Sequence, residues 1–202
     1  MKPVVGLLFL ALAAAVSPPT PPTFPLLFSI NFTSTVFELG QVGNGTLFYN
    51  FVEQPTPQNP SWQAVANSLC PTGNVHAPCR YVFIDEGPSS KPAFWVVTDN
   101  FCCLAVETGP VIPKVLLSWT FWGTFDVMGV LCDNYYSLEG GVNNLNSFSI
   151  AHKDQRFVAM SRAGEGEFNA TLLWQFTSGF QLGPPDPAMR VLPSFCKSSC
   201  AK

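Results

Sequence analysis

Apolar and polar residues alternate along much of the chain, and this pattern predicts a protein built from β-strands. In residues 28–36, Phe28, Ile30 and Phe32 fall on one side of an extended chain while short polar residues fall on the other. Residues 168–177 repeat the pattern, with Trp174 among the residues predicted to face inward. Both segments are typical of strands that bury one face.

The remaining elements follow from shorter apolar runs and from the Gly, Pro and Asn residues between them. A Gly-Asn-Gly turn at residues 43–45 predicts a hairpin. A short helical turn is predicted at 61–69, a loop at 70–78 and a second helical segment near 111–117. Further strands are predicted at 47–51, 81–84, 94–98, 101–106, 118–125, 127–138, 147–151 and 156–160. Because little chain remains for crossover helices, we expect a mainly β fold of curved antiparallel sheets, a half-barrel or sandwich, with one or two short helices.

The first residues have the features of a secretory signal peptide. Lys2 precedes a short apolar run that ends in small residues and a cluster of prolines. The run is too short for a membrane-spanning helix, and no second stretch is long enough. We therefore expect a signal peptide over residues 1–17 and one disulfide-bonded β domain over 18–202 with a Pro-rich C-terminal tail. The destination is extracellular, or the lumen of the secretory or lysosomal system.

Charge is sparse in this chain. Only 11% of the 202 residues are charged, with 10 Lys and Arg against 13 Asp and Glu. Removal of Lys2 with the signal peptide leaves 9 basic and 13 acidic residues, a net charge of −4. Nucleic acids are recognised through a basic surface, so the composition argues against them as partners.

Three N-x-Thr sequons begin at Asn31, Asn44 and Asn169, and none has proline in its middle position. Glycans at these sites would supply solubility that the few charged residues do not. Asn31 falls on the polar side of its predicted strand, where a glycan would project into water.

The seven cysteines are an odd number for a secreted protein, which indicates three bridges and one spare thiol, or an intermolecular bond. Adjacent Cys102 and Cys103 would point to opposite faces of a strand and so find different partners. One of these two, or Cys132, is the natural candidate for the free thiol. The spacing leaves the pairing open among Cys70, Cys79, Cys102, Cys103, Cys132, Cys196 and Cys200.

No catalytic signature is present: neither a nucleophile elbow nor a metalloprotease or nucleotide-binding motif occurs. A catalytic triad would have to use His76 or His152, and the sequence around each is that of a surface turn. A zinc site at His76 and Cys79 lacks the further ligands it would need. We expect a protein that is not an enzyme and has no resident cofactor.

Aromatic residues are the more informative feature, with 18 Phe, 5 Trp and 4 Tyr. Within residues 118–125, Trp119 and Phe121 alternate with Trp122, so both faces of the strand carry bulky apolar groups. Such a sheet must be covered on both faces or line an apolar cavity. The candidate lining residues of a ligand pocket are Trp95, Trp119, Phe121, Trp122 and Trp174.

Several motifs in order resemble the ependymin-related proteins: FSINFTSTV (28–36), GNGTLFYNF (43–51), CRYVFI (79–84), FCCLAVETGPVIP (101–113), GVLCDNYY (129–136) and LLWQFTSGFQ (172–181). The resemblance spans most of residues 28–200. It implies a half-barrel like that of bacterial lipoprotein carriers of the LolA type, with secretion, N-glycosylation and disulfides. It also implies a lipid or other hydrophobic ligand, and an association with calcium and with homodimers.

Three functions follow in order of preference. The first is a secreted, non-enzymatic glycoprotein that binds a lipid or other hydrophobic ligand in an apolar pocket. The second is an extracellular structural or adhesion protein whose sheet is only a scaffold. The third is a hydrolase, which would need an acid or histidine cluster in a cleft.

Overall fold

The computed structural model describes residues 19, 23, 25–37, 40–72, 75–88, 91–106, 119–137, 146–165 and 170–200. The predicted signal peptide, the predicted helical segment at 111–117 and Asn169 lie outside these residues. No helix within the described ranges is long and apolar enough to cross a membrane.

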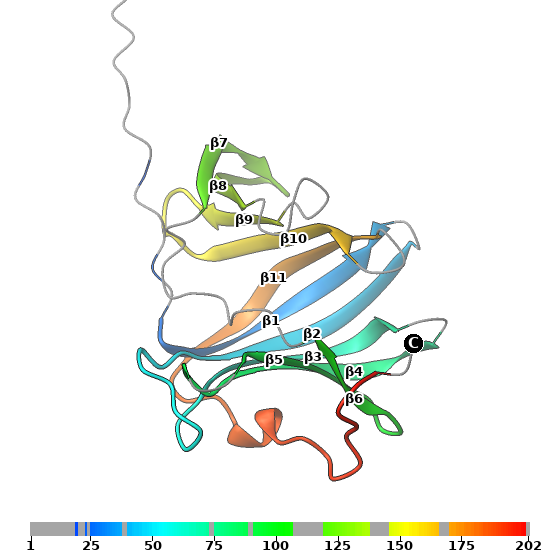
Figure 1. The fold of residues 1–202 in the computed structure, drawn as a ribbon. Helices are drawn as coiled ribbons and strands as arrows, with labels where there is room; N and C mark the ends of the chain where they lie inside the picture. Colours follow the sequence, from blue (N-terminus) through cyan, green and yellow to red (C-terminus); the bar gives the residue numbers. More distant parts are fainter. Residues whose placement is uncertain are drawn as a thin grey trace, which may run out of the picture.

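Eleven strands form one continuous antiparallel sheet in the order β6-β5-β4-β3-β2-β1-β11-β10-β9-β8-β7 (Figure 1). The sheet is not closed, because β6 and β7 are its two edges and do not pair with each other. It curves strongly, so that one face is concave. The prediction of a mainly β fold with a curved antiparallel sheet is confirmed. The strands are β1 (Leu27–Val36), β2 (Gln41–Asn50), β3 (Ser61–Thr72), β4 (Val75–Asp85), β5 (Ala93–Val97), β6 (Cys102–Val106), β7 (Thr120–Val127), β8 (Val130–Ser137), β9 (Asn146–Ala151), β10 (Phe157–Glu165) and β11 (Ala170–Leu182).

β1 lies at the centre of the sheet and defines its two faces. Phe28, Ile30 and Phe32 are buried on the concave face, whereas Asn31 on the opposite face is exposed. The pairing with β2 places Tyr49 beside Phe28, because partners in an antiparallel ladder share a face. The alternation of β1 therefore continues across the sheet as a buried concave face.

The predicted turn at residues 43–45 is wrong. The β1–β2 connection is earlier, at Gly40, where φ is +60° and the backbone N–H donates to the Phe37 carbonyl at 3.2 Å. Gly45 lies within β2 because only a residue without a side chain fits there. A Cβ at this position would lie 2.4 Å from the ring of Phe32 and 2.5 Å from the Ala66 carbonyl oxygen. Glycine in a strand can mark such a close approach instead of a turn.

The helical turn predicted at 61–69 and the loop predicted at 70–78 are also wrong. The described residues of these segments, 61–72 and 75–78, belong to β3 and β4, which pair from Ser61 and Asp85 to Thr72 and Val75. Trp62 and Val65 are buried on opposite faces, so the residues of β3 lack the one-sided pattern of a surface strand. A 3-10 helix, η2 (Pro187–Arg190), lies in the C-terminal tail.

The C-terminal tail covers the convex face of β3 to β6 (Figure 1). Arg80 of β4 holds the tail by donating to the carbonyl oxygens of Ala188 at 3.1 Å and Val191 at 2.6 Å. Disulfides join Cys102 to Cys196 and Cys103 to Cys200.

The cysteine predictions can be compared with these bonds. Cys102 and Cys103 do bind different partners, as their alternation predicted, and Cys132 is a buried free thiol. Cys79 is disulfide-bonded. The side chain of Cys70 lies outside the described part of the structure. Burial, the largest effect, raises the pKa of the Cys132 thiol, which makes it a poor nucleophile at neutral pH.

Candidate functional site

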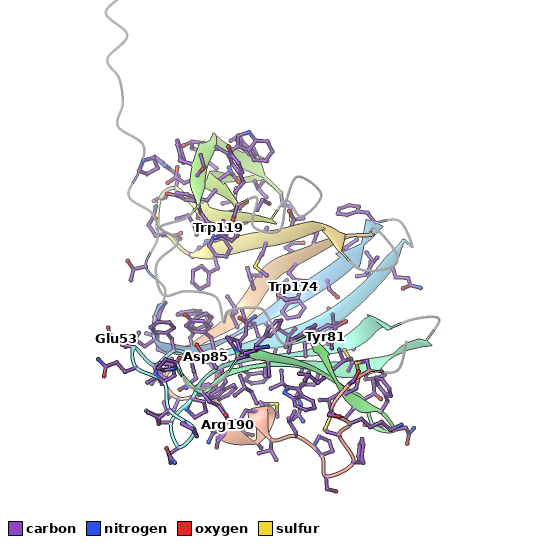
Figure 2. All side chains as sticks on the ribbon, in the orientation of Figure 1. Glu53, Tyr81, Asp85, Trp119, Trp174 and Arg190 are labelled. Atoms are coloured by element: carbon purple, nitrogen blue, oxygen red, sulfur yellow. A yellow bond between two sulfur atoms is a disulfide. The ribbon has the colours of Figure 1, made fainter. Side chains whose placement is uncertain are left out.

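The concave face carries a large group of apolar side chains, which we call the interior cluster. Its buried members come from β1, β2, β3, β8, β9 and β11, so it joins strands that are far apart in the sheet. In Figure 2, Trp119, Trp174 and Tyr81 lie inside the curve of the sheet, while Arg190 lies on the outer side. The interior cluster consists of Phe28, Ile30, Phe32, Leu47, Tyr49, Val65, Tyr135, Phe148, Ile150, Trp174 and Phe176, with Phe51, Tyr81, Phe83, Trp119, Phe121, Phe157 and Met160 packed against it at partial burial.

Aromatic rings make most of the contacts inside the curve. Phe157 lies 5.6 Å from Phe28, 5.4 Å from Phe148 and 6.1 Å from Phe176, measured between ring centroids. These separations are typical of edge-to-face and tilted aromatic pairs. Phe180, 44% exposed, extends the group to the surface through contacts with Phe28 and Phe157 at 5.5 and 5.8 Å. The interior is thus continuous with an exposed apolar rim.

Trp174 combines an apolar ring with a polar group that has no partner. Its indole stacks on Phe32, with centroids 4.9 Å apart and planes at 25°. Its Nε1–H is buried and has no hydrogen-bond acceptor among the described residues. Leaving such a donor unsatisfied costs about 1–3 kcal/mol. The interior therefore holds one strong donor that a ligand oxygen would satisfy.

The interior cluster joins side chains from both sides of the sheet centre, β2–β6 and β7–β10, which we call the two arms. Val65 of β3 and Tyr135 of β8 belong to the same buried cluster, but the strands of one arm do not pair with those of the other. Separating the arms would break apolar contacts without breaking a backbone ladder. The open sheet can admit a ligand by this movement or by displacement of interior side chains.

The predicted lining residues divide between the two faces. Trp119, Phe121 and Trp174 belong to or pack against the interior cluster. Trp95 packs on the opposite face, under the tail, beside Val82 and Leu192. Trp122 is 58% exposed.

Trp122 faces away from the interior because it is the strand neighbour of Phe121, which packs against the interior cluster. The register with β8 shifts between Phe121 and Gly123, and the Trp122 ring contacts Phe125 and Tyr136 at 5.6 and 6.0 Å.

Sequence reasoning missed Tyr49 and Tyr81 as interior residues. The alternation of 47–51 and 81–84 carried that signal.

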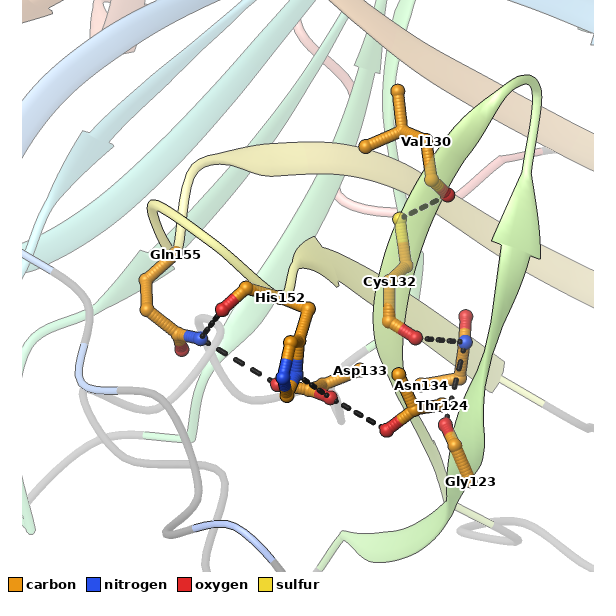
Figure 3. Close-up of polar contacts among 8 residues, drawn as sticks. All are labelled: Gly123, Thr124, Val130, Cys132, Asp133, Asn134, His152 and Gln155. Atoms are coloured by element: carbon orange, nitrogen blue, oxygen red, sulfur yellow. Dashed lines mark hydrogen bonds and ion pairs between the residues drawn. The ribbon is translucent and has the colours of Figure 1, made fainter.

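A polar cluster lies at the end of the β7–β8 hairpin (Figure 3). The buried carboxylate of Asp133 contacts His152 Nδ1 at 2.8 Å and accepts from Thr124 Oγ1 at 2.8 Å. Gln155 Nε2 lies 3.5 Å from its second oxygen. Burial alone would raise the pKa of Asp133, but the hydrogen bonds from Thr124 and His152, with the His152 charge, hold that pKa below its ordinary value.

The Asp133–His152 pair has part of the geometry of a catalytic dyad. The histidine side chain is 56% exposed and lines a cavity of about 430 Å³ with Leu131 and Arg156. A triad also requires a nucleophile on the other ring nitrogen, and no described residue bonds to His152 Nε2. Thr124 donates to the carboxylate and not to the imidazole. The contacts tie the β9–β10 turn to the β7–β8 hairpin.

The remaining candidate sites lie on the convex face or outside the described residues. Asn31 and Asn44 are both exposed on the convex face. The side chain of His76 is not described. Among the described residues no group of three or more His, Cys, Asp or Glu side chains is placed to hold a metal ion.

The sequence matches no protein-family model, and no curated protein is similar to it. The resemblance to ependymin-related proteins thus stays a prediction from the sequence motifs.

Proposed function

We propose that this protein is a secreted, non-enzymatic glycoprotein that binds a lipid or other hydrophobic ligand on the concave face of its sheet. The observation that carries the proposal is the interior cluster, an apolar surface that lines an open sheet and reaches the exterior at Phe180. Apolar concave sites with few polar groups are the usual form of small-molecule binding sites. Disulfides on the C-terminal tail are in keeping with a secreted protein.

Trp174 favours an amphiphilic ligand over a pure hydrocarbon. The unsatisfied indole N–H of Trp174 lies beside the aromatic ring of Phe32. A ligand with an apolar chain and one oxygen acceptor, such as a fatty acid or an ester, satisfies that donor and covers the rings. Binding is driven by apolar burial, at roughly 25 cal/mol per Å² removed from water, and the hydrogen bond orients the ligand.

Entry of the ligand requires some of the interior side chains to move aside. Phe32, Tyr49 and Tyr135 are almost fully buried against one another and their neighbours. Phe121, Phe157 and the other partly exposed residues at the margin are better placed to move first. Because β6 and β7 do not pair with each other, the arms can separate while every ladder stays intact.

The test begins with protein secreted from eukaryotic cells. Native mass spectrometry should show a bound mass that organic extraction removes, and the extracted protein should bind a long-chain fatty acid saturably. A matched pair of variants on β7, Phe121→Ser and Phe125→Ser, locates the site. Phe121 packs against the interior cluster, whereas Phe125 is 41% exposed. Phe121→Ser should weaken fatty-acid binding and Phe125→Ser should not. Absence of both bound lipid and saturable binding in folded protein contradicts the proposal.

A further inference from the structure

The two sequons on β1 and β2 face each other across the strand pair. The register places Asn31 opposite Thr46 and Thr33 opposite Asn44. Thr46 Oγ1 donates to Asn31 Oδ1 at 2.8 Å, and Thr33 Oγ1 donates to Asn44 Oδ1 at 3.3 Å. Each sequon threonine therefore binds the acceptor asparagine of the other sequon, on the convex face.

This reciprocal bonding sends the two amide nitrogens in opposite directions. The oxygen of Asn31 faces β2, and its Nδ2 lies over Gly179 of β11, where a Cβ would approach it to 2.5 Å. The oxygen of Asn44 faces β1 through Thr33. Because oxygen and nitrogen diverge from the carboxamide carbon, Asn44 Nδ2 is directed away from Thr33. Glycans on the two nitrogens would leave on opposite sides.

A groove of about 950 Å³ begins at the sequon pair and runs across β3 and β4 toward the C-terminal tail. Thr46, Ala66 and Arg80 form one row of its floor, since they are successive partners in the β2–β3 and β3–β4 ladders. The small side chain of Ala66 keeps this floor low. Pro193 and Phe195 of the tail form the far wall, and Phe195 is 48% exposed.

We infer that Asn44 carries an N-linked glycan whose proximal sugars lie in this groove against Phe195. Asn44 lines the groove, so a glycan on its Nδ2 is tethered at the entrance. Hydroxyl and amide groups at Asn44, Thr46, Ser68 and Thr98 offer hydrogen bonds to sugar hydroxyls. The aromatic ring of Phe195 offers a surface for the apolar face of a pyranose. Asn31 also lines this groove, at the end nearest β11, but its Nδ2 lies over Gly179, so its glycan leaves over β11.

The inference rests on the secretion and glycosylation in the proposed function, but not on the hydrophobic ligand. It assigns the glycan of Asn44 a structural part: the sugars cover the junction between the sheet and the tail that Arg80 and the Cys102–Cys196 disulfide hold. The exposure of Phe195 is then explained, because its ring contacts the sugar chain that is attached to Asn44.

The experiment compares release of the two glycans by a peptide N-glycosidase, which converts each linked Asn to Asp. Protein secreted from eukaryotic cells is digested in the folded state for increasing times, and peptide mass spectrometry follows each site. Release at Asn44 should be slower than at Asn31 in folded protein, with similar rates after denaturation. Phe195→Ala should accelerate release at Asn44 several-fold and leave Asn31 unchanged. Phe125→Ala, an exposed Phe on β7, is the matched control and should alter neither site.

Two results overturn the inference alone: a bare Asn44 in secreted protein whose Asn31 is glycosylated, or a release rate at Asn44 that Phe195→Ala does not change. Secreted protein without glycan at any of the three sequons overturns the glycoprotein assignment as well. If the secreted protein binds no lipid but its Asn44 glycan is released slowly, only the ligand proposal is contradicted. Melting curves of the Phe195→Ala and Phe125→Ala proteins show whether both are folded.

Discussion

The indole of Trp174 stacks on the ring of Phe32 while its N–H, buried beside that ring, has no acceptor within the described structure. Trp174→Phe keeps an aromatic ring but removes this donor together with part of the indole, and a ligand without oxygen reports the effect of the smaller ring. We expect about two- to tenfold weaker binding of a fatty acid, because one hydrogen bond contributes roughly 0.5–1.5 kcal/mol. Binding of a ligand without oxygen should be almost unchanged. Calorimetric titration of both ligand types checks this, and an equal loss for both would contradict the role given to the N–H.

Gly45 is required where the ring of Phe32 closes over β2. Gly45→Ala places a methyl group against both that ring and the Ala66 carbonyl. We expect a loss of about 1–3 kcal/mol in the free energy of unfolding, as for other overpacked sites. Val42→Ala, at a 65% exposed position of the same strand, should change it by less than about 0.5 kcal/mol. Urea denaturation compares the two, and equal stabilities would contradict the close approach.

The Cys102–Cys196 disulfide closes a long loop between β6 and the tail, with a sequence separation of 94. Cys196→Ser combined with Cys102→Ser should lower the free energy of unfolding by about 2–5 kcal/mol. The tail should also become sensitive to proteolysis near Leu192. Cys132→Ala serves as the control because that thiol is free. A double variant as stable as the wild type would show that the tail is held without this bridge.

The ionisation of Asp133 should make part of the free energy of unfolding depend on pH. Its pKa is below the ordinary value of about 3.9, so the carboxylate stabilises the fold above that pH. This contribution is lost as the pH falls through the lowered pKa. Asp133→Asn should cost about 1–3 kcal/mol at neutral pH, and the difference from wild type should shrink as the pH falls below the ordinary carboxyl pKa of about 3.9.

The control for that measurement is Asp154→Asn. Asp154 forms an exposed ion pair with Arg156 at 3.3 Å, and such pairs contribute roughly 0–1 kcal/mol. Thermal unfolding across the pH range should separate the two variants clearly. A gap between wild type and Asp133→Asn that is constant from pH 7 to pH 3 would contradict the stabilising role of the charge.

The alternation in residues 28–36 was sufficient to predict β1, its buried face and the exposure of Asn31. It could not identify Gly45 as a strand residue, because Gly-Asn-Gly has the composition of a turn. Only the position of Phe32 on the neighbouring strand explains the glycine. The sequence of β3 does not indicate a strand for a related reason. Its residues are buried on both faces, so apolar and polar positions do not alternate clearly.

Alternation assigns side chains to two faces but does not say which face curves inward. Trp95 and Trp119 were therefore grouped together from the sequence, and the structure places them on opposite faces. The spacing of Cys102 and Cys103 correctly required two partners. Choosing Cys196 and Cys200 depends on the path of the tail, which local pattern does not determine.

The central claim is that a hydrophobic ligand occupies the concave face, and quenching by a spin-labelled fatty acid tests it most directly. Delipidated protein is titrated while tryptophan emission is recorded for wild type, Trp95→Phe and the double variant Trp119→Phe with Trp174→Phe. We predict saturable quenching that persists in Trp95→Phe, whose ring lies on the convex face, and that is largely lost in the double variant. Unsaturable quenching, or quenching that the double variant retains in full, would contradict the account.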